Sequence, residues 1–303
     1  MMRGPHTWSV ACRKPDLSIS VEHYPLPAYH ERWPILRQPL LRGMLVLVES
    51  LLIGIKALMI SANHAIDEEE EQLSDKQLAG TLFTAMAVFS AVFILLPVFG
   101  TKLVESMFDL ELTESNQFWF NLIEGGIRLA MFVGYLAFIG MFKDVRRVFQ
   151  YHGAEHKTIY AYENGDPLNA QEIDDKYPTL HVRCGTNFLF IVLFLTILVH
   201  FVMDLFITAD LIPRLIIRLA AVPFLAGISY EAIKFASRNE DSKIFHVLML
   251  PGLALQRITT KPPSLDQIEV AIAAMTAVAQ DIDDPKAAVE EQSHEDTPEA
   301  PIS

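Results

Sequence analysis

Long apolar segments separated by shorter polar ones dominate the pattern along this chain. Four of these segments reach the length, about 20 residues, that a helix needs to cross a hydrocarbon core about 30 Å thick. We therefore expect transmembrane helices over residues 78–103, 118–142, 187–207 and 211–236.

A fifth apolar segment, residues 37–62, differs because it contains Arg42, Glu49 and Lys56. A charge at the centre of a bilayer costs about 3 kcal/mol per residue on insertion scales. We expect an amphipathic helix that lies in the interface or re-enters the membrane part-way. A full span, with Glu49 paired inside a bundle, is the alternative.

Two short stretches near the N-terminus alternate apolar and polar residues, residues 8–13 and 17–24. Lys14, Pro15 and Asp16 lie between them and favour a turn. This pattern predicts a β-hairpin. The expected fold class is therefore an all-α polytopic membrane protein with about four transmembrane helices, one interfacial or re-entrant helix and a small N-terminal β-hairpin region.

The same pattern divides the chain into segments. After the last apolar segment we expect helices over residues 244–255 and 265–279, the second with a capping box formed by Ser264 and Gln267. The expected order is a partly β cytoplasmic segment (1–36), the interfacial helix (37–62), an acidic loop (63–77), the first two transmembrane helices (78–142), a cytoplasmic His/Cys segment (143–186), the last two transmembrane helices (187–236), a cytoplasmic helical segment (237–280) and a disordered acidic tail (281–303).

Composition and charge support this organisation. The chain is 51% hydrophobic, and its net charge of −13 is local: residues 67–71 carry −5 and residues 281–303 carry −7. The acidic balance therefore says little about a substrate. No basic stripe with interleaved aromatic residues is present, so nucleic acid is not an expected partner. The two cysteines, Cys12 and Cys184, are far apart, which favours a reducing compartment over a disulfide framework.

The distribution of basic residues predicts the orientation. If the chain crosses the membrane four times, three segments lie on one side: the N-terminal segment, residues 143–185 and the segment after the last span. These three segments hold almost all of the Lys and Arg outside the spans. Positive residues mark the cytoplasmic side. We expect a multi-pass protein of the cytoplasmic membrane with both termini in the cytoplasm.

The candidate chemistry lies in the segment between the second and third spans. His152 and His156 are four residues apart, so on a helix they share a face and can present two imidazoles to one ion. Glu155 is close enough to act on a bound water, and His-x-x-Glu-His is the inverted order of a metalloprotease zinc signature. His181 and Cys184 have the two-residue spacing that lets side chains converge on a metal.

These four side chains predict Zn²⁺, with Fe²⁺ as second choice, because imidazole and thiolate suit both metals. If all four bind, the site is closed and structural. If three bind and water takes the fourth place, the site is catalytic, with Glu155 as general base. Two alternatives need no metal: Lys157 and Arg183 could bind lipid phosphate, or the polar residues could simply be solvated at the interface.

A second polar set lies within the expected spans. Glu124 and Arg128, and His200 and Asp204, are i,i+4 pairs, and Arg218 lies in the fourth span. Intramembrane charge usually faces the bundle interior and is paired. We interpret the set as a structural ion network, with a proton or ion route as the alternative.

The chain contains six short motifs: Met-Met-Arg-Gly-Pro at residues 1–5, Pro-Leu-Leu-Arg-Gly at 39–43, Tyr-His-Gly-Ala-Glu-His-Lys at 151–157, His-Val-Arg-Cys-Gly-Thr at 181–186, Pro-Gly-Leu at 251–253 and Gln-Arg-Ile-Thr-Thr at 256–260. In these motifs the chain resembles a known family, the YqhQ-like bacterial membrane proteins. The family usually has proline where this chain has Val182, which leaves the predicted ligands intact. It also usually has a Gly-rich lead-in before the first motif, so a start further upstream is an open alternative.

The resemblance implies a location in the bacterial inner membrane and a metal site in a domain of unknown function described as a predicted metal-dependent enzyme. It supplies no substrate. We carry three hypotheses: a metal-dependent hydrolase acting on a lipid or membrane-embedded substrate at the cytoplasmic face, a scaffold or membrane-protein biogenesis factor with a structural metal site, and a transporter. The expected partners are membrane lipid and either a second copy of the chain or another membrane protein.

Overall fold

The computed structural model describes residues 1–26, 35, 38–65, 117–206, 211–237 and 242–283, with scattered positions between residues 80 and 107. Most of the predicted span over 78–103, of the acidic loop and of the acidic tail therefore lies outside the described residues. The chain forms two compact units. Unit 1 comprises Met1–Glu70, Arg146–His181 and Thr260–Ser303, and unit 2 comprises Glu71–Val145 and Val182–Thr259.

Unit 1 contains a small antiparallel sheet in the order β1-β2-β3. Its strands are β1 (Met2–Arg3), β2 (Thr7–Arg13) and β3 (Ile19–Pro25). In the turn, Asp16 accepts the backbone N–H of Ser18, and Leu17 has a φ of 69°. The predicted hairpin is confirmed, and β1 adds a short third strand that the pattern did not predict.

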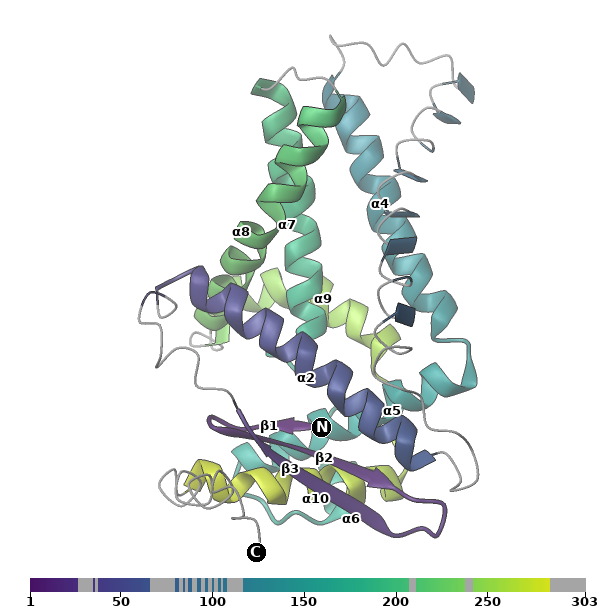
Figure 1. Cartoon of the computed structure of the whole chain (residues 1–303), viewed down its shortest axis with the longest axis vertical. Coiled ribbons are helices and arrows are strands. Elements are labelled where there is room, and N and C mark those ends of the chain that lie inside the picture. The colour runs from purple at the N-terminus through teal and green to yellow at the C-terminus, as the bar shows by residue number, and fades with distance from the viewer. Residues whose placement is uncertain are drawn as a thin grey trace, which may run out of the picture. The chain divides into compact units, whose positions relative to one another are not determined.

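The alternation of β2 sorts its side chains onto two faces, each covered by a helix. Trp8, Val10 and Cys12 pack against helix α2 (Leu41–Ala65). On the other face, Ser9 donates to the carbonyl of Ala274 in helix α10 (Leu265–Asp283) at 2.7 Å. The sheet is therefore the middle layer between α2 and α10 (Figure 1).

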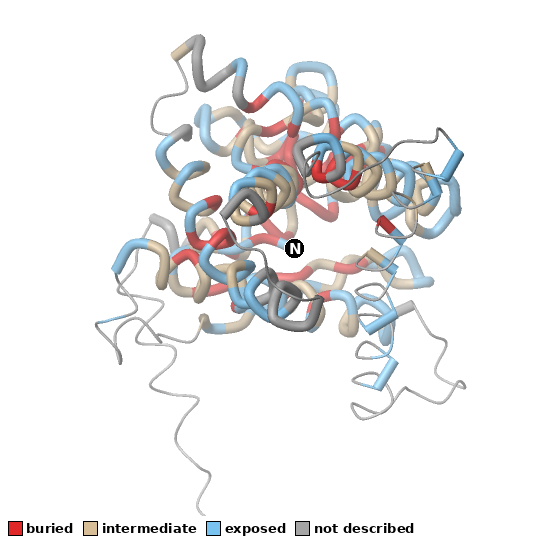
Figure 2. Tube along the Cα trace, turned by 90° about the horizontal axis from the view of Figure 1, so that it is seen from above, coloured by how far each residue is buried: buried red, intermediate tan, exposed pale blue. Residues whose placement is uncertain are grey.

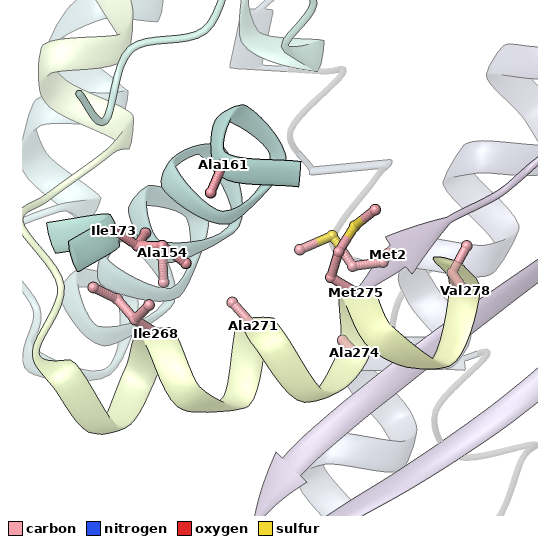
Figure 3. Close-up of a cluster of buried hydrophobic side chains, with 9 residues drawn as sticks. All are labelled: Met2, Ala154, Ala161, Ile173, Ile268, Ala271, Ala274, Met275 and Val278. Atoms are coloured by element: carbon pink, nitrogen blue, oxygen red, sulfur yellow. The ribbon is translucent and has the colours of Figure 1, made fainter. Parts of the chain in front are cut away.

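Helix α10 also packs against the two other helices of unit 1, α5 (Lys143–Glu163) and α6 (Ala170–Lys176). Figure 3 shows Ile268 and Ala271 of α10 facing Ala154 of α5 and Ile173 of α6. All four of these side chains are buried. This cluster holds α5, which carries the predicted site, against the rest of unit 1.

The predicted cap of α10 is present. The backbone N–H of Ser264 donates to Oε1 of Gln267 at 2.9 Å, which is the reciprocal half of a capping box. The helix then extends to Asp283, four residues beyond the predicted end at residue 279.

Unit 2 consists, among the described residues, of helices α4 (Gln117–Ile139), α7 (Gly185–Phe206), α8 (Leu211–Ser237) and α9 (Lys243–Thr259). Helix α7 packs against each of the other three. Helix α9 approaches α7 closely at Gly252, where a Cβ would lie 2.4 Å from Oδ1 of Asn187. Many positions along the helices are exposed, as the pale blue stretches in Figure 2 show.

Three helices in the described part of the chain are long and apolar enough to cross a membrane, judged by length and composition. They cover Leu41–His64, Asn121–Ile139 and Gly185–Met203. The second and third match the predicted spans over 118–142 and 187–207. The first falls on the segment for which we expected an interfacial or re-entrant helix.

Candidate metal centre

Helix α5 carries the central motif of the sequence. Its buried positions include Gly153, Ala154, His156, Lys157 and Ala161, which form one stripe along the helix, as the 3.6-residue period requires. The stripe faces the core of unit 1, so His156 and Lys157 are held inside the protein. His152 and Glu155 lie on the edge of this stripe and are only partly buried.

The ring of His156 is fixed by a backbone carbonyl. Its Nδ1 lies 2.6 Å from the carbonyl oxygen of Thr179, which is 23 residues further along the chain. A carbonyl only accepts hydrogen bonds, so Nδ1 must carry the proton. In the neutral ring the lone pair is then on Nε2. A histidine that binds a metal through one nitrogen and donates the other N–H to a carbonyl has this arrangement.

His152 lies one turn before His156 and next to it in space. The two ring centroids are 4.4 Å apart at an interplanar angle of 65°, and a nitrogen of each ring lies within 4.8 Å of one of the other. Zinc–nitrogen bonds are about 2.1 Å long. Two nitrogens bound to one zinc are therefore at most about 4.2 Å apart. The two rings lie close to this spacing, and imidazole is a ligand that suits zinc.

His181 is buried beside the pair but faces other partners as well. Its ring centroid lies 5.5 Å from that of His156 and 4.6 Å from that of Tyr160. Its Nε2 is 3.8 Å from a carboxylate oxygen of Glu163. The structure thus brings the three predicted histidine ligands of unit 1 together around α5, with Tyr160 and Glu163 as neighbours that the sequence pattern did not single out.

The edge of this cluster is held by a polar group at the end of α6. The carboxylate of Asp166 accepts from the ammonium of Lys176 and from the hydroxyl of Tyr177. The bond from Lys176 lowers the pKa of Asp166 and raises the pKa of Lys176. The ring of Tyr177 is parallel to that of Tyr160, with centroids 6.0 Å apart. Through Tyr160, this group supports the position of His181.

Glu155 is placed differently from the histidines. Its side chain is partly exposed, and within the described ranges no hydrogen bond or ion pair engages its carboxylate. It follows His152 by three positions, so the two residues are neighbours on the helix surface. A carboxylate that is held near a candidate ligand and open to solvent can accept a proton from water.

Gly153 explains how a second segment reaches the site. A Cβ at this position would lie 2.3 Å from the carbonyl oxygen of Lys261 and 3.3 Å from Cγ2 of Thr179. The N–H of Lys261 donates to the carbonyl of Phe149 at 2.9 Å. The chain before α10 therefore packs against the backbone of α5 between the two histidines, and this approach requires glycine.

Lys157 is buried, and its ammonium is engaged. Its Nζ donates to the carboxylate and to the backbone carbonyl of Asp174, both at 2.7 Å. The ion pair connects α5 to α6. The contact of Lys157 with lipid phosphate stays a prediction.

Cys184 and Arg183 belong to unit 2. Cys184 is buried, and its Sγ accepts the backbone N–H of Thr186 at 3.3 Å at the start of α7. N–H groups at a helix N-terminus stabilise negative charge on sulfur. Cys184 is the third residue after His181, so the covalent chain limits the distance between their Cα atoms to about 11 Å. Its role as a ligand stays a prediction from the His-x-x-Cys spacing, and Arg183 is exposed.

The predicted polar set in the spans is described in part. Nη2 of Arg128 lies 2.5 Å from Oε1 of Glu124, and both side chains are largely buried. This is the i,i+4 ion pair that the spacing predicted. His200 is buried in α7. The side chains of Asp204 and Arg218 lie outside the described residues, so the rest of the network stays a prediction.

Comparison with known proteins places these motifs in a wider set. The sequence model of the family described as "Protein of unknown function (DUF1385)" matches residues 38–281. The chain is 34% identical over 287 residues to the "Uncharacterized protein YqhQ" of Bacillus subtilis (strain 168), and the alignment covers 90% of this chain and 86% of that protein. No solved structure matches the chain.

Proposed function

The chain belongs to the DUF1385 family of YqhQ-like proteins, and from the geometry of α5 we propose that it is a metal-dependent hydrolase of the bacterial inner membrane. Its substrate is a lipid or another membrane-embedded molecule, reached at the cytoplasmic face. His152 and His156 hold the ion, with His181 beside them. Zn²⁺ is the expected metal, and Fe²⁺ is second choice.

One observation carries the proposal: the hydrogen bond between Nδ1 of His156 and the carbonyl of Thr179. A buried histidine that only fills space can bond through either nitrogen. Here the bond leaves Nε2 as the lone-pair atom of the neutral ring, and a second imidazole lies next to it. This pre-orientation of a ligand by its other nitrogen is what a metal site needs.

With Zn²⁺ held by the histidines of α5, a carbonyl or phosphoryl oxygen of the substrate would be polarised and the pKa of a bound water would be lowered. The protein's own contribution is Glu155. Its carboxylate accepts the proton of the attacking water and returns it to the leaving group, so that the oxygen of water replaces the leaving group on the substrate. The partial exposure of Glu155 supports this role, since both substrate and water must reach it.

The membrane location is supported by three helices that are long and apolar enough to span. The basic residues of the N-terminal segment and of residues 143–185 support a cytoplasmic position for both termini and for α5. A substrate from the membrane fits this location. Arg183, which is exposed, is the proposed contact for a lipid phosphate.

A second function, a scaffold or biogenesis factor with a structural metal, is favoured by one observation. His156 and His181 are each only 4% exposed, and a structural metal site has protein ligands at all four positions, with none open to water. In that case the ion connects α5 to the segment that contains Thr179 and His181, and Glu155 has no chemical role.

The variant Glu155→Gln separates the two functions. We expect it to keep the metal and the fold and to abolish the lipid turnover that the unmutated protein supports, measured by mass spectrometry of lipids from cells that express each form. The matched control is Glu172→Gln, at an exposed glutamate of α6. If cells that express Glu155→Gln have the same lipid profile as cells that express the unmutated protein, the hydrolase hypothesis is wrong and the structural metal site is favoured.

A further inference from the structure

Helix α2 has two faces of opposite character. One face carries Glu49, Ile53, Ala57 and His64, a stripe with spacings of four, four and seven residues. The first three are buried, with exposures of 7–8%. The opposite face carries Val48, Leu51, Leu52 and Leu58, which are 53–62% exposed. At 100° per residue the two stripes point in opposite directions. We call the second stripe the outer face of α2.

The sheet covers the other face of α2 along most of the helix. Arg3 pairs with Glu49 at 2.8 Å, about a third of the way along the helix, and Glu22 pairs with His64 at 2.8 Å near its C-terminal end. These two helix positions are 15 residues apart, or about 22 Å along the axis. Strand β2 has seven residues and a similar length, about 24 Å. The helix therefore lies along the sheet rather than touching it at one end.

A charged side chain also contacts the sheet midway along this interface. The ammonium of Lys56 lies 3.9 Å from the ring centroid of Tyr24 and 5.6 Å from that of Trp8. Ile53 and Ala57 pack between these charged positions against Trp8, Val10 and Cys12. Glu49 and Lys56, two of the three charges that made α2 an unusual span in the sequence, are thus directed to partners in the sheet.

This packing argues against a transmembrane position for α2. If α2 crossed the bilayer, the sheet along its side would lie in hydrocarbon too. Strand β3 is an edge strand in the described sheet, so one side of its backbone makes no bonds within that sheet. Open sheet edges do not occur in lipid, because nothing there can satisfy those groups. The sheet must therefore remain on the water side.

We infer that α2 lies in the plane of the membrane, with its outer face in lipid and its other face on the sheet. The inference rests on the membrane location proposed above. Lipid is the occupant that the composition fits: the outer face is wholly apolar, and the segment Leu41–His64 meets the length and hydropathy of a span. In this position α2 is an in-plane membrane anchor that holds unit 1, including α5, at the bilayer surface.

Spin labels in the full-length chain, reconstituted in vesicles of phosphatidylethanolamine and phosphatidylglycerol, test the inference. Labels are attached at Val48→Cys, Leu51→Cys and Leu58→Cys, and their depth is measured from collisions with oxygen and with a water-soluble nickel complex. Cys12 and Cys184 are buried, and an unsubstituted sample measures their background. An in-plane helix places all three labels at one shallow depth, about 5–10 Å. A crossing helix places Leu51 near the midplane, about 15 Å deep.

A label at Phe194→Cys, an exposed position near the middle of α7, is the matched control. We expect it near the midplane. If the labels at positions 194 and 51 are equally deep, the in-plane position of α2 is wrong, and the membrane location of the protein is retained. If Phe194 is in water, the proposed membrane location itself fails, and the inference fails with it. If the α2 labels are shielded from both collision partners, a protein surface covers the outer face and lipid is excluded.

Discussion

The Nδ1 atom of His156 lies 2.6 Å from the carbonyl oxygen of Thr179, and this bond fixes the orientation of a buried imidazole beside His152. The two bonded residues come from different segments of unit 1, α5 and the chain that follows α6. The bond therefore has two consequences that can be separated by mutation. It contributes to the stability of the fold, and it leaves the lone pair of the neutral ring on Nε2, the atom that the proposed metal site uses.

Two substitutions at His156 separate these consequences. In His156→Asn the side-chain amide nitrogen is in the position of Nδ1 and can still donate to Thr179, while Nε2 is lost. In His156→Ala both nitrogens are lost. We expect the asparagine variant to be more stable than the alanine variant by about 1 kcal/mol, the typical net value of a hydrogen bond. Thermal unfolding of the metal-free proteins in detergent measures this difference, and equal midpoints would argue against the bond to Thr179.

Gly153 gives a prediction about packing. In Gly153→Ala the new methyl group meets the carbonyl oxygen of Lys261 at 2.3 Å, and backbone cannot move aside easily. We expect a loss of about 1–3 kcal/mol of stability. The control is Gly54→Ala in α2, where nothing lies within 4 Å of the new Cβ. Alanine is the better helix former, so this control should be neutral or up to about 1 kcal/mol more stable. Equal destabilisation by both changes would contradict the close approach of Lys261.

The ion pair of Lys157 and Asp174 predicts unequal effects of its two halves. The side chain of Lys157 is 9% exposed and that of Asp174 is 36% exposed. In Asp174→Asn the ammonium stays buried without its countercharge, and breaking a buried ion pair costs about 3–5 kcal/mol. Because the backbone carbonyl of residue 174 still accepts from the ammonium, we expect a loss of stability at the lower end of this range. In Lys157→Met the remaining carboxylate is hydrated, and we expect a loss of about 1 kcal/mol. Thermal unfolding of the two variants compares these values. If Asp174→Asn is more stable than Lys157→Met, the prediction that the buried ammonium depends on its countercharge is wrong.

Tyr24 gives a prediction of pH dependence. Its hydroxyl donates to the carboxylate of Glu22, and this bond raises the pKa of Tyr24 to about 12. In the unfolded chain a tyrosine titrates near 10. The stabilisation is therefore fully present below about pH 10 and is lost as the pH rises through 12. Unfolding midpoints between pH 9 and 12 should fall more steeply for the unmutated protein than for Tyr24→Phe. Parallel curves for the two proteins would show that this bond does not form.

The sequence predicted the parts of the fold that repeat with a regular period. The alternation of Trp8, Val10 and Cys12 predicted the hairpin, and the i,i+4 spacing of His152 and His156 predicted two neighbouring rings on one helix. Strand β1, with Met2 and Arg3 alone, is too short to show any period. Periodicity also could not decide the position of α2, because a helix packed on a sheet and a helix in a bundle have the same apolar spacing.

The supporting contacts of the site could not be predicted, for a different reason. Thr179 acts through its backbone carbonyl, and every residue has one, so no side-chain pattern marks it. The pairing of Lys157 with Asp174 depends on how α6 folds back on α5, which local spacing does not encode. Gly153 was part of a recognised motif, but its purpose, the approach of Lys261, required the three-dimensional structure.

The metal content of the purified full-length protein is the most direct test of the proposed metal centre. Elemental analysis of the unmutated chain and of His156→Asn, purified side by side without chelators, compares two proteins that both keep the bond to Thr179. We expect about one zinc or iron per chain in the unmutated protein and a loss of most of it in the variant. No stoichiometric metal in the unmutated protein, or full retention of the metal in His156→Asn, would rule out the proposed metal centre.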